Sequence, residues 1–198
     1  MTRKLVIADT GGANVASLRF AFERLGELAT VTSDGATIAS ADRVVLPGVG
    51  AAGPSMERLR AAGLVSVLRT LSQPVLGICL GMHLLFQKSA EGATSCLNLM
   101  PGTVDGIAPS PGRPVPHMGW NELRRLKDDP LLEGIGERDY AYFVHSYAVG
   151  VSEFTLASTE YGAPLSAVVR RNNFYGAQFH PERSGRTGAR LLDNFLRL

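Results

Sequence analysis

Residues 74–86 read PVLGICLGMHLLF, and this stretch decides how the rest of the chain is interpreted. Its first apolar run predicts a buried strand, and the apolar spacing over residues 82–86 predicts a helix. Between them, Gly77 and Gly81 flank Cys79 in a Gly-x-Cys-x-Gly motif. This motif is the thiol counterpart of the nucleophile elbow, in which glycines let a strand and a helix approach closely while the nucleophile stands out of the turn.

The predicted helix starts directly after Cys79. Its amide dipoles should therefore favour the thiolate and lower the pKa of Cys79 below the free value of about 8.5. A buried structural cysteine at a strand-to-helix junction is the alternative interpretation of the same motif. The elbow is thus a hypothesis that the rest of the chain has to support.

Length and composition favour a single globular domain over residues 1–198, with 45% hydrophobic residues and a formal net charge of +2. The arginines are scattered along the chain, so we expect no nucleic-acid partner. Cys79 and Cys96 are too few for a disulfide framework, and no pair has metal-ligand spacing, so we expect neither a metal nor a cofactor. The apolar segment at residues 5–8 is too short for a signal peptide or a membrane span. We therefore expect a cytoplasmic protein.

The first half of the chain alternates predicted strands and helices. Strands are expected at residues 5–8, 28–32 and 44–46 before the elbow strand, and helices at 15–25, around Met56 and at 64–71. Residues 9–14 would form the first strand-to-helix turn. This order predicts an α/β fold with a mostly parallel sheet covered on both faces, and a site at the carboxyl ends of the strands.

The second half is richer in strand patterns. Four prolines and a glycine in residues 109–116 predict a surface loop. Strand-like runs follow at 140–149, 154–158, 165–170 and 174–179, and a last helix is expected around 191–196. We expect these runs to extend the central sheet with antiparallel strands.

A cysteine nucleophile needs a base, and His180 is the histidine with a partner next to it in His180-Pro181-Glu182. An extended backbone would place the His180 and Glu182 side chains on one face, where the carboxylate can hold the working tautomer. A strand end with a solvated carboxylate is the alternative.

A glycine-rich stretch, PGVG at residues 47–50, follows the third predicted strand. Backbone amides there and at Leu80 could form an oxyanion hole, in which each donor contributes about 3–4 kcal/mol in known cases. An ordinary turn or a phosphate cradle is the alternative, although no Gly-Lys-Ser or Gly-Lys-Thr ending supports a P-loop.

The elbow and the distant His-Pro-Glu motif together resemble the class I (triad) glutamine amidotransferases. Four further segments resemble one branch of that class, the glutaminase subunit of imidazole glycerol phosphate synthase. They are LPGVG at 46–50, PHMGWN at 116–121, FVHSY at 143–147, and QFHPE at 178–182 followed by Ser184-Gly185. The resemblance runs from the first strand to the last helix and implies a flavodoxin-like fold with glutaminase activity.

The resemblance also implies residue roles. Cys79 would attack the glutamine side-chain amide, His180 would protonate ammonia and then activate water, and Glu182 would orient His180. The amides of Val49 and Leu80 would hold the oxyanion. The implied substrate-binding residues are Gly48, Gly50, His83, Glu91, Ser146 and Tyr147, with Glu91 facing the α-ammonium group. For Glu91 the alternative is an ordinary solvated loop residue.

The implied partner is a (βα)8-barrel cyclase, which would receive the ammonia in a heterodimer of histidine biosynthesis. Trp120 and Arg183 are the residues expected near that partner. Three other interpretations stay open. They are the glutaminase subunit of another amidotransferase, such as the one serving anthranilate synthesis, a non-catalytic module of the same fold, and a cysteine esterase or peptidase.

Several positions depart from the family pattern. His83 stands where the family has glutamine, Arg183 replaces a lysine, and Thr10 and Ala13 alter the first turn. We expect His83 still to contact the substrate, although imidazole offers a different hydrogen-bonding geometry from an amide. His117, His145 and Cys96 are interpreted as structural residues.

Overall fold

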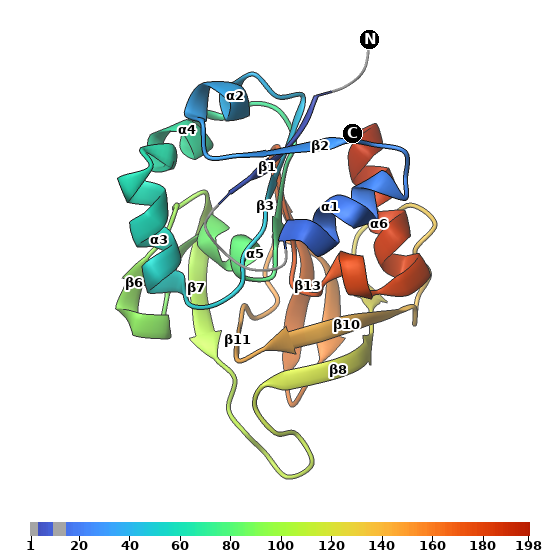
Figure 1. Ribbon diagram of the computed structural model, residues 1–198. Helices are drawn as coiled ribbons and strands as arrows, with labels where there is room; N and C mark the ends of the chain where they lie inside the picture. The colour runs from blue at the N-terminus through green and yellow to red at the C-terminus, as the bar shows by residue number, and fades with distance from the viewer. Residues whose placement is uncertain (1–3, 10–14) are drawn as a thin grey trace.

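An eight-stranded sheet forms the centre of the computed structural model, which describes residues 4–9 and 15–198 (Figure 1). The strand order is β2-β1-β3-β4-β14-β13-β12-β9. The first five strands are parallel to one another: β2 (Ala29–Thr32), β1 (Leu5–Ala8), β3 (Arg43–Leu46), β4 (Val75–Ile78) and β14 (Phe174–Ala177). The remaining three are antiparallel: β13 (Pro164–Arg171), β12 (Thr155–Glu160) and β9 (Arg124–Arg125). The expected mostly parallel α/β fold is confirmed.

Helices cover both faces of this sheet, as Figure 1 shows. On one face lie α1 (Val15–Glu23) and α6 (Gly185–Arg197). On the other lie α2 (Gly35–Ala39), α3 (Ala52–Ala61), α4 (Leu64–Thr70) and α5 (Leu80–Leu85). No helix in the described ranges is both long and apolar enough to cross a membrane.

Successive side chains of the buried strands point to opposite faces of the sheet, so each strand contributes to the core on both faces. In β1, Leu5 and Ile7 join the core beneath α1 and α6, whereas Val6 and Ala8 join the core beneath the other helices. All four side chains are almost fully buried, which is why the strand reads as one continuous apolar run. The same burial on both faces fixes the sheet in the middle of the molecule.

Every helix expected from the sequence is present, although some begin or end at other residues, and one short helix was not expected. The elbow helix ends at Leu85, because Phe86 takes up an extended backbone and begins a strand. Helix α2 was not predicted. It is five residues long and buries only Ile38, so the sequence shows no apolar periodicity there. Asp34 caps this helix by accepting a hydrogen bond from the Thr37 amide at 2.8 Å. The expected turn at residues 10–14 lies outside the described residues.

The prediction that the later strands all extend the central sheet antiparallel is partly wrong. The run at 140–149 breaks at Ser146 into β10 (Tyr140–His145) and β11 (Tyr147–Ala148), which belong to different smaller sheets. β10 pairs with β8 (His117–Glu122), and β11 joins β7 (Met100–Gly106), β5 (Phe86–Ser89) and β6 (Thr94–Ser95). β14 is parallel to β4. An alternating pattern identifies a strand but carries no information about its direction or its neighbour.

Candidate active site

Cys79 lies at the turn between β4 and α5, with φ 52° and ψ −110°. This left-handed φ is a strained conformation for a residue with a side chain, typically at a cost of about 1–3 kcal/mol. Two glycines allow the turn to pack so tightly. A Cβ at Gly77 would lie 2.6 Å from the carbonyl oxygen of Gly81, and a Cβ at Gly81 would lie 1.8 Å from that of Leu46. The glycines thus hold Cys79 against the ends of β3 and β4.

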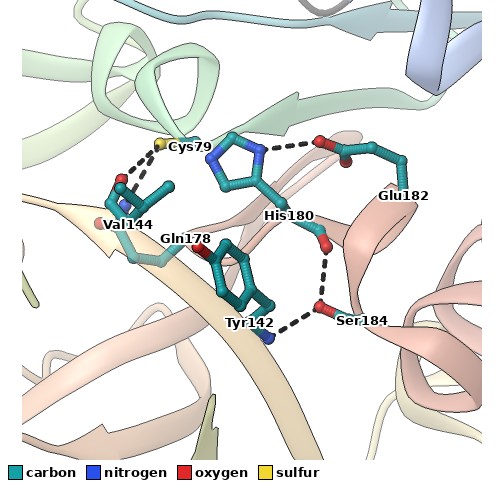
Figure 2. Close-up of polar contacts among 7 residues, drawn as sticks. All are labelled: Cys79, Tyr142, Val144, Gln178, His180, Glu182 and Ser184. Atoms are coloured by element: carbon teal, nitrogen blue, oxygen red, sulfur yellow. Dashed lines mark hydrogen bonds and ion pairs between the residues drawn. The ribbon is translucent and has the colours of Figure 1, made fainter. Parts of the chain in front are cut away.

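His180 and Glu182 lie beside this cysteine, as Figure 2 shows. The Nδ1 atom of His180 is 2.8 Å from Oε1 of Glu182, and both side chains are buried. The backbone that brings them together is not the expected extended one. Residues Pro181–Arg183 form a 3-10 turn, because the fixed φ of Pro181 suits the first position of a helical turn. Glu182 therefore reaches back to His180 from within that turn.

The protonated form of His180 is favoured by its neighbours. Burial alone would lower the pKa of His180, but the hydrogen bonds and charges of Cys79 and Glu182 outweigh it and raise the pKa to about 10. His180 is therefore expected to be an imidazolium near neutral pH, beside the sulfur of Cys79. A protonated imidazole in this place can act as an acid toward a leaving group.

Ser184 anchors the backbone of His180, a role that sequence reasoning missed. Its hydroxyl donates to the carbonyl oxygen of His180 at 2.7 Å and accepts from the amide of Tyr142 at 2.9 Å (Figure 2). The amide of His180 in turn donates to the carbonyl oxygen of Tyr142 at 3.0 Å. These bonds attach the backbone of His180 to β10, so the position of His180 does not depend on the contacts of its imidazole alone.

A cavity of about 660 Å³ opens beside Cys79. It gathers most of the residues expected in the site: Val49, Gly50, Cys79, Leu80, His83, Glu91, Ser146, Tyr147 and His180, together with Arg183. Gly48 is not in the lining, and a Cβ there would be 2.6 Å from the amide nitrogen of Gly81. Trp120 lies outside the cavity and is 56% exposed. Among residues 4–9 and 15–198, no group of three His, Cys, Asp or Glu side chains could hold a metal ion.

Glu91 has a structural contact as well as a place at the cavity. Its Oε2 accepts a hydrogen bond of 2.8 Å from the amide of Ala52, the first residue of α3. The carboxylate thus satisfies a free amide at a helix N-terminus, where negative charge is stabilising. The alternative of a merely solvated loop glutamate does not fit this contact.

Gln178 and Val144 complete the surroundings of the sulfur, and neither was singled out from the sequence. The Cys79 thiol is 3.9 Å from the carbonyl oxygen of Val144, and Nε2 of Gln178 is 4.0 Å from the sulfur (Figure 2). His145 also lines the cavity. The sequence shows that Gln178 is two positions before His180, but it does not show that Gln178 lies beside Cys79, 99 positions earlier in the chain.

This arrangement defines an α/β protein in which a cysteine at a strand-to-helix turn lies beside a hydrogen-bonded histidine–glutamate pair. The family model for glutamine amidotransferase class-I matches residues 6–198. Imidazole glycerol phosphate synthase subunit HisH of Idiomarina loihiensis is 53% identical, covering 98% of this chain and 97% of the relative, and that of Xanthomonas axonopodis pv. citri is 52% identical with the same coverage. A solved structure of a glutamine amidotransferase superposes with a TM-score of 0.76 at 20% identity, covering 98% of this chain and 97% of that one. The chain belongs to the class-I glutamine amidotransferases and, within them, to the HisH family.

Proposed function

We propose that this chain hydrolyses L-glutamine to glutamate and ammonia as the glutaminase subunit of an imidazole glycerol phosphate synthase. The observation that carries the proposal is that Cys79 and His180 line one cavity while His180 is hydrogen-bonded to Glu182. The two free, buried cysteines of the chain, Cys79 and Cys96, suit a reducing compartment, and we place the reaction in the cytoplasm.

In the first half of the reaction, the Cys79 thiolate adds to the side-chain amide carbon of glutamine. The carbonyl electron pair moves onto oxygen, and the amides of Val49 and Leu80, whose residues line the cavity, stabilise that charge. The His180 imidazolium then gives its proton to the departing nitrogen. Ammonia leaves and a thioester remains on Cys79.

In the second half, neutral His180 takes a proton from water, and the hydroxide adds to the thioester carbon. The carbon–sulfur bond breaks, which releases glutamate and restores the thiolate–imidazolium pair. Glu182 keeps the Nδ1 proton of His180 in place through their 2.8 Å hydrogen bond, so the Nε2 atom is the one that exchanges protons.

Substrate binding is assigned to groups around the same cavity. We assign the Glu91 carboxylate to the α-ammonium group of glutamine, because it combines negative charge with a place in the lining. Ser146, Tyr147, Gly48 and Gly50 complete the proposed glutamine-binding set. The ring of His83 is also in the lining, although its Nε2 atom already bonds to Gln178 at 2.7 Å.

The proposed partner is a (βα)8-barrel cyclase that receives the ammonia and forms imidazole glycerol phosphate and aminoimidazole carboxamide ribotide. An apolar patch on the β8–β10 sheet supports a partner there. Met118, Trp120 and Tyr140 are 66%, 56% and 50% exposed, and Trp120 lies edge-on to Tyr142 with ring centroids 6.0 Å apart. Met118 pairs across the strands with Val144, which lines the cavity, so patch and cavity adjoin. Trp120 and Arg183 are the proposed contacts.

The test is glutamate release from glutamine by the purified chain, alone and with a cyclase barrel and its nucleotide ligand. We expect low release by the chain alone and a strong rise when both are added, with Cys79→Ala inactive throughout while still binding the partner. Turnover by Cys79→Ala would exclude Cys79 as the nucleophile. No hydrolysis by the parent chain in any combination would favour a non-catalytic module.

A further inference from the structure

Gln178 and His180 reach Cys79 from the same segment. β14 ends at Ala177, and the amide of Gln178 continues its pairing by donating to the carbonyl oxygen of Ala167 at 2.8 Å. Side chains alternate along this extended stretch, so Phe179 points into the core while its two neighbours point the other way. Figure 2 shows both neighbours at Cys79, the imidazole on one side and the amide on another.

The sulfur of Cys79 needs a donor once it loses its proton. The carbonyl oxygen of Val144, 3.9 Å away, can accept from the thiol but only repels a thiolate. Besides His180, the amide of Gln178, whose nitrogen is 4.0 Å from the sulfur, is a side-chain donor that can offset this repulsion. Gln178 is fully buried, so water does not compete for its amide.

His83 fixes which end of that amide faces the sulfur. Its Nε2 atom lies 2.7 Å from Oε1 of Gln178, a carbonyl-type oxygen that only accepts, so the histidine must be the donor. With Oε1 held toward α5, the NH2 group of Gln178 is left on the side of Cys79. Burial lowers the pKa of His83 to about 4, against a smaller opposing effect of the hydrogen bond to Gln178, so the imidazole stays neutral while it donates.

We propose that Gln178 is a further catalytic residue that donates an amide hydrogen bond to the Cys79 thiolate, and that His83 is a positioning residue that orients this amide. The inference rests on the proposed role of Cys79 as nucleophile. It also assigns a use to His83, whose Nε2 atom bonds to a buried side chain.

The pH dependence of Cys79 alkylation by iodoacetamide tests this proposal without glutamine, partner or turnover. Cys96, whose pKa burial raises to about 11, is the internal control when both labelled peptides are quantified by mass spectrometry. We expect Gln178→Met to raise the midpoint of the Cys79 profile by about one pH unit, as for loss of one hydrogen bond to a charged group. An unchanged midpoint in Gln178→Met would overturn the role of Gln178.

His83 is tested on two backgrounds. We expect His83→Leu to raise the midpoint less than Gln178→Met, and His83→Gln, which restores an amide donor, to keep it near the parent value. In the Gln178→Met background, His83→Leu should add nothing, because it acts through the lost amide. An additive shift would show that His83 acts by another route.

The parent chain provides a second measurement that needs no variant to fold. In ¹⁵N NMR spectra at pH 7, His83 should be neutral with its proton on Nε2. A proton on Nδ1 would reverse the amide and overturn the proposal. A chain that fails to hydrolyse glutamine but passes these tests would contradict the proposed function and leave the contact to the thiolate in place.

Discussion

His117 donates a hydrogen bond from Nδ1 to Nε2 of His145 across 3.0 Å. The direction follows from the outer partners. Nδ1 of His145 lies 2.9 Å from the carbonyl oxygen of Tyr147, so it must donate there and leave its Nε2 as an acceptor. Nε2 of His117 then accepts from the side-chain amide of Asn121 at 3.2 Å. Every member of the chain is satisfied when both imidazoles are neutral.

This pair links the small β8–β10 sheet to the cavity wall. His117 and His145 are directly opposed in the strand register. The ring of His117 is stacked between those of Phe143 and Tyr161, with centroid distances of 4.9 and 3.9 Å. The neutral pair thus fixes the backbone just before Ser146 and Tyr147, which we propose to bind glutamine.

The first prediction is a loss of stability in mild acid. Burial lowers the pKa of His117 to about 4 and that of His145 to about 3. Unfolded histidines take up protons below about pH 6.5, so between that pH and about 4 the unfolded state binds more protons than the folded one. We expect the free energy of unfolding to fall by up to about 1.4 kcal/mol per pH unit for each such histidine. Urea unfolding at pH 7.0, 6.0 and 5.0 measures this.

Two other histidines also affect how the free energy of unfolding changes with pH. His83, with a pKa lowered to about 4, adds to the loss in the same range. His180 does not, because its raised pKa of about 10 means that its stabilising effect is complete below pH 6.5 and is lost only as pH rises toward 10. A His117→Gln variant should show a shallower slope than the parent. Equal stability of the parent at pH 7.0 and 5.0 would contradict the neutral pair.

The second prediction concerns the charge on Glu182. Glu182→Gln removes the carboxylate that accepts from Nδ1 of His180, so the pKa of His180 should fall and its correct tautomer should be lost. We expect kcat for glutamine hydrolysis to drop about 10³–10⁴-fold, as for the equivalent change in another triad. The alkaline limb of the pH–rate profile should move to lower pH. Exposed Glu137→Gln is the matched control, and a parent-like rate in Glu182→Gln would remove Glu182 from the mechanism.

The sequence was sufficient for the parts of the fold that short-range patterns encode. Gly77, Gly81 and the apolar runs beside them predict the elbow, because a close strand-to-helix approach leaves no room for side chains there. The direction of β14 was not predictable, since it is decided by its pairing with β4, about 100 residues away in the chain. Local patterns do not report such distant partners.

The same limit applies to the site. His180 and Glu182 are two positions apart, so their contact was predictable even though the turn that makes it was not. The bonds of Gln178 to His83 and of His145 to His117 join residues 95 and 28 positions apart. A single buried histidine is commonly structural, so the sequence did not indicate that His83, His117 and His145 bond to other side chains. Only the folded structure shows these bonds.

The third prediction concerns the packing of the elbow. Gly81→Ala would place a methyl group 1.8 Å from the carbonyl oxygen of Leu46, so β3 and α5 must separate. We expect a loss of about 1–3 kcal/mol or more in the free energy of unfolding. At Gly150, nothing lies within 4 Å of an added Cβ and no positive φ is recorded, so Gly150→Ala is the matched control. Equal unfolding midpoints for the two variants would show that the elbow tolerates the extra methyl group.

The fourth prediction concerns the exposed patch beside the cavity. Trp120 is 56% exposed, so Trp120→Ala should leave the folded chain intact while removing the aromatic contact that we propose for the cyclase partner. We expect at least a tenfold loss in affinity for the barrel, the effect of losing an interface residue worth about 2 kcal/mol. Leu28→Ala is the control, because Leu28 is 80% exposed and precedes β2, an edge strand of the central sheet that pairs with neither β8 nor β10. Equal affinities of the two variants by titration calorimetry would place the interface elsewhere.

The fifth prediction separates two roles of Glu91. Glu91→Gln keeps an oxygen that can accept from the amide of Ala52 but removes the charge proposed to face the α-ammonium group of glutamine. Glu91→Ala removes both. We therefore expect Glu91→Ala to lower the free energy of unfolding more than Glu91→Gln does, by about 0.5–2 kcal/mol as for other helix caps. Both variants should raise KM for glutamine at least tenfold, because a hydrogen bond to a charged group is worth about 1.5–3 kcal/mol. A parent-like KM in Glu91→Gln, with a normal unfolding midpoint, would make Glu91 a helix cap and move ammonium recognition to another group.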